Sequence, residues 1–466
     1  MLRVLESIVG RAAAEPNRPA LLDEAGAMTY GELTAAVRRT AAWAQSLPAT
    51  VGLLAPKDRQ AVIWHLALAW AGRTVVPLPD FFAPAQLAHM AADADIAAVV
   101  AAPAVADLAR GLGRPVLQPA EAEPDHDGPT GGARWIIYTS GTTGRPKGVV
   151  IGEAQIDASV TALALAAAAG PTDRMLSVLP FALLLEQVAG IALPLALGAA
   201  VALCPDPRGL AAAAERFAPT ATILVPELLA AWVAGLEGAG RQAPASLRFV
   251  AVGGAPVPPA LAERAWAVGL PVYEGYGLSE CCSVVALNRP NERQGGTVGR
   301  PLPGVEVTIE DGEIVVTGTT VMAGYLGGGP AGGRHRTGDL GHFDAAGRLV
   351  VEGRRDEMIV TTTGRNIQPE WIETMILADR RIARCAVVDG GSYPRAVLVA
   401  ADPRLAEADA GTIDALVARL TAAAPEYARP QANRLVSEAM LHRQHWITAN
   451  GRLQRRAIAA YYKEFP

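Results

Sequence analysis

Short apolar runs alternate with longer segments of helical hydrophobic spacing from the N-terminus to about Gly295. The helical spacing occurs at Thr29–Leu47, Gln60–Ala71 and Pro84–Ala94. Because adjacent parallel strands need a crossover between them, this alternation is typical of α/β layers with largely parallel sheets. The predicted strands are Thr50–Leu54, Thr74–Pro77, Ile96–Ala101, Trp135–Thr139, Arg174–Leu179, Ala200–Cys204, Ala221–Val225 and Arg248–Val252.

The pattern changes after Gly295, where glycine and proline become dense and segments of alternating polarity follow one another. This alternation predicts antiparallel strands, at Val305–Glu310, Glu313–Thr317 and Leu349–Glu352. The apolar pattern is weakest in the charged turn Gly353–Asp356, beyond which helical and strand patterns return. We therefore predict a large N-terminal domain of layered α/β sheets with a small β-barrel portion, residues 1–353, and a smaller α+β domain, residues 357–466.

Composition and charge exclude several classes of protein. Hydrophobic residues make up 51% of the 466 residues and charged residues 19%, which predicts a folded chain. The net charge of −5 is spread along the sequence, without a basic stripe for nucleic acid or a polybasic membrane patch. The most membrane-like run, Val188–Cys204, is short and is interrupted by glycine and proline. We therefore expect a buried helix–turn–strand there, and no integral membrane span.

Cysteine usage and the N-terminus favour a cytoplasmic protein. The four cysteines, two of them adjacent, show no metal-ligand spacing and are too few for a disulfide framework in so long a chain. The segment Met1–Gly10 lacks the apolar core of a signal peptide. Both features are expected of a protein in a reducing cytosol. The cysteines are Cys204, Cys281, Cys282 and Cys385.

The stretch Tyr138–Gly148 is the part of the sequence most typical of a binding site. It reads Tyr-Thr-Ser-Gly-Thr-Thr-Gly-Arg-Pro-Lys-Gly and directly follows an apolar strand. Glycines let backbone N–H groups approach an anion, hydroxyls add donors, and Lys147 adds a positive charge for phosphates. Only three of the 41 basic residues are lysine, so a retained lysine is informative. The spacing is not that of a Walker A loop, and taken alone the stretch could be a polar surface loop.

This stretch resembles the signature of the adenylate-forming superfamily, which includes acyl-CoA synthetases, carrier-loading adenylation domains and luciferase-like enzymes. Five further stretches match motif positions of that family in the expected order, and the resemblance covers nearly the whole chain. The position of the family's C-terminal catalytic lysine motif is occupied by Asn450-Gly451-Arg452. The other three resemblances are Gly253-Gly254-Ala255-Pro256, Tyr276-Gly277-Leu278-Ser279-Glu280 and Thr337-Gly338-Asp339, and Gly353-Arg354-Arg355-Asp356 matches the hinge region.

The resemblance implies a site for ATP and Mg²⁺. Glu280 would help to hold Mg²⁺, a hard cation suited to carboxylate and phosphate oxygens. Tyr276 would stack on the adenine, Asp339 would accept from both ribose hydroxyls, and Arg354 would donate to the ribose. Taken singly, Tyr276 could be a core residue, Glu280 a solvated charge and Asp339 a turn residue. The remaining nucleotide contacts implied are Thr139, Ser140, Gly141, Thr142, Thr143, Gly144 and Lys147 around the phosphates, and Gly254, Ala255, Gly277 and Ser279 near the base.

The resemblance also implies a moving C-terminal domain. Residues 354–356 would form a hinge, with Asp356 absorbing the backbone change as the domain rotates between adenylation and thioester formation. A loop containing Gly364, Arg365 and Asn366 would then face the acyl-adenylate and help to admit the thiol. A merely flexible surface loop is the alternative for this segment.

The acid side is expected in Leu179–Gln187, which resembles a segment of fatty acyl-CoA synthetases. Phe181 and Leu183, together with Gly253, are its predicted contacts; many relatives carry histidine or an aromatic residue where Leu183 stands. The segment lacks the aspartate with which amino-acid-activating members bind an ammonium group. An apolar fatty or aryl acid is therefore expected, although any one of these residues could belong to a core helix.

Arg452 is the main departure from the family, because the catalytic lysine is expected at that position. Arginine keeps the positive charge, but its planar fork is bulkier and directed differently. Arg452 could substitute for the lysine, in keeping with the preference of this chain for arginine; it could make adenylation slow; or the protein could have another role. Arg365 also stands where relatives often have lysine.

The resemblance thus implies ATP-dependent conversion of a carboxylic acid to acyl-AMP with release of pyrophosphate, followed by transfer to the thiol of CoA. Lys147, Glu280 and Arg452 would be the catalytic residues. One alternative acceptor is the phosphopantetheine of a carrier protein, which ends in the same thiol arm. A catalytically weak or inactive nucleotide-binding homologue, and a relative that uses the chemistry on another oxyanion or in amide formation, are further alternatives.

Overall fold

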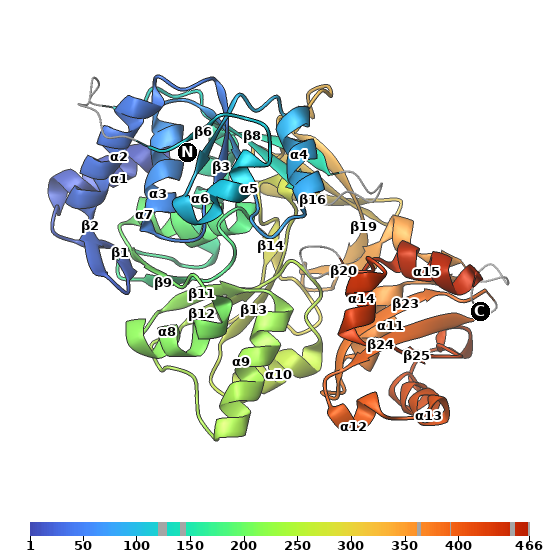
Figure 1. The fold of residues 1–466 in the computed structure, drawn as a ribbon. Coiled ribbons are helices and arrows are strands. Elements are labelled where there is room, and N and C mark those ends of the chain that lie inside the picture. The colour runs from blue at the N-terminus through green and yellow to red at the C-terminus, as the bar shows by residue number, and fades with distance from the viewer. Residues whose placement is uncertain (120–127, 140–145, 361–364, 392, 448–452, 465–466) are drawn as a thin grey trace.

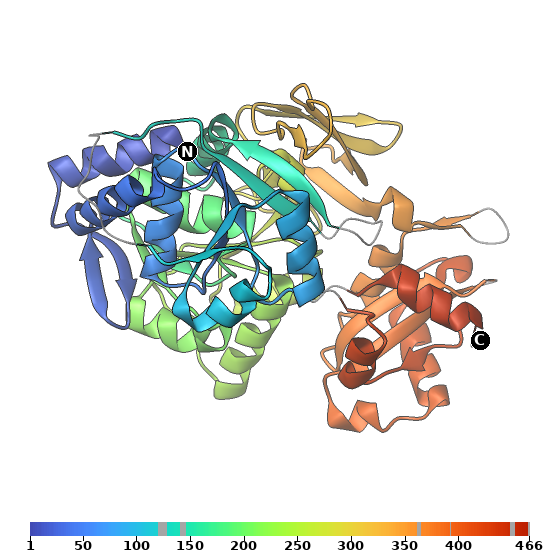
Figure 2. The same ribbon diagram turned by 45° about the horizontal axis from the view of Figure 1, so that its top comes forward.

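The computed structural model of the chain describes residues 1–119, 128–139, 146–360, 365–391, 393–447 and 453–464 (Figure 1). It confirms the predicted class, a mixed α/β fold with several sheets. Two large, mostly parallel sheets and three layers of helices build the part up to about Gly295, and smaller sheets follow. Orange and red elements, which come last in the sequence, group together beside β20 (Leu349–Arg354) in both views (Figures 1 and 2).

The first large sheet has the strand order β15-β14-β13-β12-β11-β9-β10-β1-β2. Its central strands β10, β11 and β12 are largely apolar because both of their faces are buried. Leu176, Leu224 and Val250 face one helical layer, whereas their neighbours Met175, Ile223 and Phe249 face another. The bounds are β1 Pro19–Asp23, β2 Gly26–Thr29, β9 Arg174–Ser177, β10 Ala200–Leu203, β11 Ala221–Leu224, β12 Phe249–Val252, β13 Val272–Tyr276, β14 Ala286–Leu287 and β15 Arg300–Pro301.

The second large sheet has the order β18-β8-β7-β4-β3-β5-β6. Its successive side chains also point to opposite faces of the sheet. Trp135 and Ile137 join the core that is shared with the first sheet, while Ile136 and Tyr138 face outward to a separate apolar cluster. β7 and β8 form an antiparallel hairpin in which Thr139 pairs with Lys147. The bounds are β3 Thr50–Leu54, β4 Thr74–Pro77, β5 Ala98–Ala101, β6 Val116–Leu117, β7 Arg134–Thr139, β8 Lys147–Gly152 and β18 Gly324–Tyr325.

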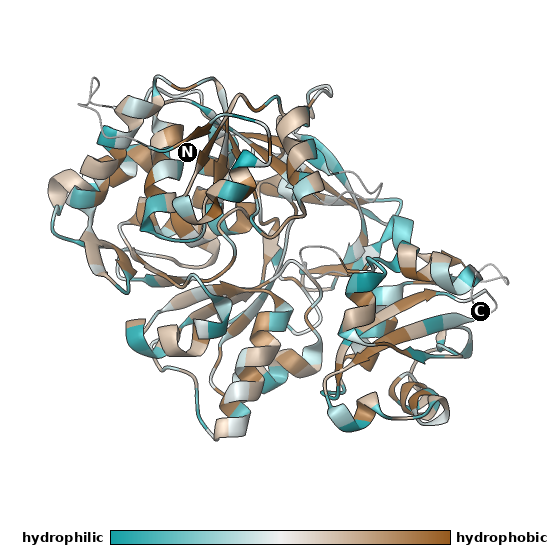
Figure 3. Ribbon diagram, viewed as in Figure 1, coloured by the Kyte–Doolittle hydropathy of each residue, from teal (hydrophilic) through white to brown (hydrophobic). Residues whose placement is uncertain are grey.

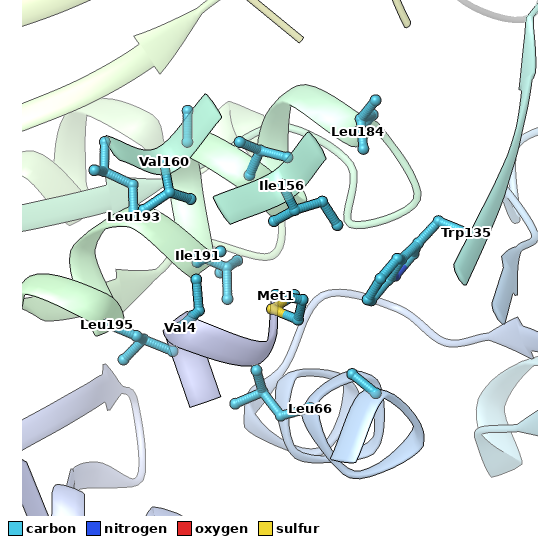
Figure 4. Close-up of a cluster of buried hydrophobic side chains, with 14 of the residues drawn as sticks. Met1, Val4, Leu66, Trp135, Ile156, Val160, Leu184, Ile191, Leu193 and Leu195 are labelled. Carbon is cyan, nitrogen blue, oxygen red and sulfur yellow. The ribbon is translucent and has the colours of Figure 1, made fainter. Parts of the chain in front are cut away.

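Helices fill three layers around these two sheets. The middle layer lies in the shared core, where ten of the twelve residues of α3 are buried. Figure 4 shows part of this core, with Met1, Leu66, Trp135 and Ile191 close together. Hydrophobic residues concentrate on the strands and on the helix faces packed against them (Figure 3). The middle layer holds α1 Leu2–Ala14, α2 Tyr30–Ala44, α3 Arg59–Trp70, α6 Glu153–Ala166, the π-helical segment η2 Glu186–Ala192 and α7 Leu193–Leu197; the outer layers hold α4 Pro84–Asp93 and α5 Ala106–Arg110, and α8 Leu210–Phe217, α9 Pro226–Ala239 and α10 Pro259–Ala267.

The region after Gly295 contains the predicted antiparallel strands, in the order β16-β17-β19-β20. The C-terminal elements pack around β23 and β24 and form two apolar clusters of their own. The division into domains at residues 353 and 357 stays a prediction. The bounds are β16 Val305–Glu310, β17 Glu313–Gly318, β19 Arg334–Phe343, β20 Leu349–Arg354, β21 Ile359–Val360, β22 Asn366–Ile367, β23 Ile382–Asp389, β24 Pro394–Ala400, β25 Arg434–Leu435, α11 Pro369–Ile376, α12 Pro403–Ala406, α13 Ala410–Leu420, α14 Glu438–Arg443 and α15 Arg455–Glu464.

The predicted helix–turn–strand at Val188–Cys204 is confirmed: η2 and α7 are followed by a left-handed turn at Gly198 and then by β10. Within the described residues, every helix is too short or too polar to span a bilayer. All four cysteines are buried and free, as expected of a chain without a disulfide framework.

Candidate functional site

Glycine-containing turns follow β12 and β13 at the carboxyl edge of the first sheet. Gly253 and Gly254 follow β12, and Gly254 adopts a φ of 83°, which favours glycine. Gly277 follows β13, and a Cβ atom there would lie 1.7 Å from the carbonyl oxygen of Ser283. Only glycine fits this close backbone approach. The carboxyl edge of a parallel sheet is where α/β proteins bind ligands, and the predicted residues Gly254, Tyr276 and Gly277 lie there.

Tyr276, Asp339 and Arg354 form a hydrogen-bonded group at this edge. The Tyr276 hydroxyl donates to Oδ2 of Asp339, and Arg354 Nη1 donates to Oδ1 at 3.1 Å and to the carbonyl oxygen of Thr337 at 2.9 Å. Asp339 is only 9% exposed. Burial, and then the charge of Asp339, raise the pKa of Tyr276, so the phenol stays protonated as a donor. Three residues from separate motifs are thus brought together.

Asp339 projects from β19 with two other side chains on the same face. Along this strand His335, Thr337 and Asp339 alternate with the exposed Arg334 and Arg336. The arginines pair on the other side with Glu310 and Glu313. Burial lowers the pKa of His335, while the charges of Glu280 and Asp339 oppose that shift, so His335 belongs to this site. His335 was not predicted from the sequence, although its spacing of two and four residues from Thr337 and Asp339 could have indicated it.

Lys147, Tyr325 and Glu280 form a second group. Lys147 Nζ lies 5.7 Å from the centroid of the Tyr325 ring, and the Tyr325 hydroxyl donates to Glu280 Oε1 at 3.0 Å. Burial, and then Glu280, raise the pKa of Tyr325. Thr139 stands opposite Lys147 in the hairpin register. Tyr325 was also missed, because no local motif marks it. The predicted Ser140, Gly141, Thr142, Thr143 and Gly144 lie outside the described residues.

The described side chains are suited to bind Mg²⁺ only when phosphate groups supply further ligands to the ion. Among the described residues, no group of three histidine, cysteine, aspartate or glutamate side chains could hold a metal ion. Mg²⁺ commonly takes one or two carboxylates and completes its shell with water and substrate phosphates. Glu280 therefore fits as a protein ligand to a nucleotide-bound Mg²⁺.

An apolar cavity of about 60 Å³ lies between the first sheet and the middle helical layer. Its described lining contains one acidic residue, Asp173, whose carboxylate is paired with Arg248 at 2.5 Å. The predicted acid contacts Phe181, Leu183 and Gly253 do not line this cavity, although Leu185 and Ala189 of the same region do; the role of those three stays a prediction. The other lining side chains include Leu163, Met175, Leu193, Phe249, Ala251 and Val284.

A buried ion pair lies beside this region. Lys57 Nζ donates to Glu186 Oε1 at 2.7 Å, and Ser177 donates to the same oxygen. Lys57 is 5% exposed and Glu186 is fully buried. Phe181 packs edge-on against His65, with ring centroids 5.5 Å apart. The carboxylate of Glu186 is thus neutralised within the protein.

Asp356 contacts one residue within the predicted hinge and one residue of the C-terminal helix α15. Its carboxylate accepts from Arg354 Nε at 3.1 Å and from Arg456 of α15 at 3.2 Å. Next to it, Arg455 donates to Glu373 at 2.8 and 2.5 Å and to Glu357. A third carboxylate, that of Glu370, lies 3.6 Å from Arg455.

The predicted thiol-side residues lie further along the C-terminal part. Asn366 is exposed at the start of β22, and the Arg365 guanidinium lies 4.8 Å from the centroid of the Tyr427 ring. Gly364 and Arg452 lie outside the described residues. The structure thus brings together Tyr276, Asp339 and Arg354 in one group, and Lys147, Tyr325 and Glu280 in another. The nucleotide, thiol-side and catalytic-arginine assignments stay predictions.

The sequence profile of a family described as AMP-binding enzyme matches residues 9–326. The sulfoacetate–CoA ligase of Cupriavidus necator is 30% identical over 438 residues, which cover 82% of this chain and 84% of that protein. A probable non-canonical nonribosomal peptide synthetase of Salinispora arenicola, CymA, is also 30% identical over 438 residues, covering 81% of this chain. The chain spans only 5% of CymA, and 55% to 61% of two other curated CoA ligases that it matches.

Among solved structures, the O-succinylbenzoate coenzyme A synthetase of Bacillus subtilis in complex with ATP and magnesium ion is similar in fold. It superposes with a TM-score of 0.83 at 25% identity, covering 97% of this chain and 98% of that chain.

Proposed function

Because the chain belongs to the family of AMP-binding enzymes, we propose that it activates an apolar carboxylic acid with ATP and transfers the acyl group to the thiol of CoA. The observation that carries this proposal is that side chains from motifs far apart in the sequence meet in two groups. Tyr276, Asp339 and Arg354 are suited to a nucleoside, and Lys147 and Glu280 are suited to phosphates and their metal ion.

In the first step, one carboxylate oxygen of the acid bonds to the α-phosphorus of ATP. The bond from that phosphorus to the bridging oxygen breaks, and pyrophosphate leaves. Both reactants are anions, so positive charge must be placed around them. Lys147 supplies one charge, Arg452 is proposed to supply another, and Mg²⁺ bound with Glu280 would neutralise phosphate charge when present.

In the second step, the thiol sulfur attacks the acyl carbon. AMP then leaves with the carboxylate oxygen that formed the mixed anhydride, and the thiol proton is released. The exposed Asn366 and Arg365 are proposed to face this acceptor after rotation about residues 354–356. Asp356 is suited to the hinge because it contacts Arg354 within the hinge and Arg456 of the C-terminal part.

An apolar acid is supported by the charges of the acid side. A free carboxylate would be needed to hold the ammonium group of an amino acid. In the described part of this region, Asp173 is paired with Arg248 and Glu186 with Lys57. The apolar lining of the cavity favours binding of an acid that buries hydrocarbon or ring surface.

A carrier protein is a second candidate acceptor. The similarity to the peptide synthetase CymA favours it, because the phosphopantetheine of a carrier presents the same thiol as CoA. The two acceptors differ in whether free CoA is consumed.

The experiment is to measure pyrophosphate release with ATP and Mg²⁺ across fatty, aryl and amino acids, each with and without CoA, and to identify the products. Release that needs an apolar acid and yields its CoA thioester supports the proposal. Release without any effect of CoA favours a carrier protein. Silence across the panel, while ATP is bound, would contradict the proposal; restored release by Arg452→Lys would then locate the defect.

A further inference from the structure

One face of α4 contacts both arms of the β7–β8 hairpin. On β7, the Tyr138 hydroxyl donates to Asp93 Oδ2 at 2.6 Å. On the other arm, His89 Nε2 lies 3.2 Å from the carbonyl oxygen of Pro146. Because a carbonyl oxygen can only accept, Nε2 of His89 carries the hydrogen and donates it.

These two contacts lie next to the residues assigned to phosphate binding. Tyr138 directly precedes Thr139, Pro146 directly precedes Lys147, and Thr139 pairs with Lys147 across the hairpin. His89 and Asp93 are four residues apart, so they lie on the same side of the helix. The His89 and Tyr138 rings also meet edge-on, with centroids 6.3 Å apart.

The helix is fixed to the sheet independently of these polar contacts. Its buried side chains Leu87, Met90 and Ala91 join an apolar cluster that includes Val76 and Ile136. At its N-terminus, the backbone N–H of Ala83 donates to Gln86 Oε1 at 3.0 Å. Asp93 and His89 therefore lie on a helix that is fixed to the sheet. Their hydrogen bonds can hold the hairpin in a set position relative to this helix.

We propose that His89 and Asp93 are positioning residues, which hold Thr139 and Lys147 where the β- and γ-phosphates of ATP bind. This inference rests on the proposed function of the hairpin. His89 and Asp93 would act on the nucleotide only through the hairpin arms and would not touch it.

The proposal separates two nucleotides that share a base, a ribose and an α-phosphate. ATP carries the β- and γ-phosphates that Lys147 is assigned to bind, whereas AMP lacks them. Displacement of the hairpin should therefore weaken binding of ATP and of pyrophosphate, and leave binding of AMP unchanged. A general loss of folding would weaken all three.

The test compares Tyr138→Phe, His89→Ala and Asp93→Ala with wild type by calorimetric titration of Mg·ATP, pyrophosphate and AMP. Each variant loses one hydrogen bond, so we expect the Kd for Mg·ATP and pyrophosphate to rise about threefold to tenfold, and that for AMP to stay within about twofold. Asp93→Asn and His89→Gln retain an acceptor and a donor, so they should stay near wild type.

Tyr30→Phe is the matched control. Tyr30 is also a buried phenol, and its hydroxyl donates to the carbonyl oxygens of Leu195 and Ala199 at 3.0 and 2.8 Å, away from the hairpin. We expect it to lower thermal stability about as much as Tyr138→Phe without changing either nucleotide affinity.

Two results would overturn the proposal in different ways. Equal changes in ATP and AMP affinity, or no change in either, would show that α4 has only a structural role and would leave the proposed function intact. A wild-type protein that binds neither nucleotide would contradict the proposed function itself.

Discussion

Tyr276 and Asp339, 63 positions apart in the sequence, are joined by a hydrogen bond from the phenol to one carboxylate oxygen. Arg354 donates a hydrogen bond to the other carboxylate oxygen of Asp339. The side chains of Tyr276 and Asp339 are therefore both oriented before any ligand binds. These two contacts fix the orientation of the carboxylate that is assigned to the ribose. This arrangement supports the proposal that residues from three separate motifs form a single nucleoside site.

Asp339→Asn should weaken AMP binding. The amide places an N–H₂ donor against Tyr276 or Arg354, both of which are donors, and removes one acceptor for the ribose. We expect the Kd for AMP, measured by calorimetry, to rise by about tenfold or more. Asp344→Asn is the control, because Asp344 caps the β19–β20 turn through Arg348 on the same hairpin. Unchanged affinity in Asp339→Asn would contradict the ribose assignment.

Glu370 should make the protein less stable as the pH rises. Burial raises its pKa to about 7, assisted by Glu373 and Glu357 and opposed by Arg455. A raised folded-state pKa gives stability that is fully present below the unfolded-state pKa of about 4.5 and is lost as the pH rises through about 7. Glu370→Gln should therefore be more stable than wild type by about 1 to 3 kcal/mol at about pH 8, and the difference should shrink toward about pH 5.

Urea unfolding at both pH values measures this difference. Glu373→Gln is the contrasting variant. Glu373 accepts two hydrogen bonds from Arg455, so this substitution should destabilise the protein. A stability difference for Glu370→Gln that does not vary with pH would show that this carboxyl is not titrating in the folded state.

Replacing only one partner of the Lys57–Glu186 ion pair should destabilise the folded protein. Both side chains are buried, so Lys57→Met leaves an unpaired carboxylate in the core and should cost about 3–5 kcal/mol in the free energy of unfolding. Lys57→Met combined with Glu186→Gln should recover most of that loss, as measured by urea unfolding. The exposed pair of Arg110 and Asp107 is the control, where Arg110→Met should cost less than about 1 kcal/mol. Additive losses in the double variant would contradict this account.

Local patterns predicted most of the elements that carry the site. Thr50–Leu54 and Thr74–Pro77 are strands with those bounds, and the interrupted apolar run Val188–Cys204 is a buried helix–turn–strand. The reason is that strands buried on both faces are continuously apolar, and glycine and proline mark the turns between elements. The parallel order of β9 to β13 then places the turns after β12 and β13 at one edge.

Contacts between distant residues were not predictable in this way. Glu186 lies 129 positions from Lys57, and Tyr325 lies 45 positions from Glu280, so no periodicity connects them. The cavity is likewise lined by Leu185 and Ala189 rather than by Phe181 and Leu183. Such features depend on how the layers pack.

In the proposed reaction, the carboxylate of the acid attacks the α-phosphorus of ATP. It is tested most directly by supplying an accepted acid with both carboxylate oxygens replaced by heavy oxygen, and recording the mass of AMP after thioester formation. The account predicts one heavy oxygen in each AMP and none in pyrophosphate. Heavy oxygen in inorganic phosphate, with ADP as the other product, would contradict it and would indicate attack on the γ-phosphorus.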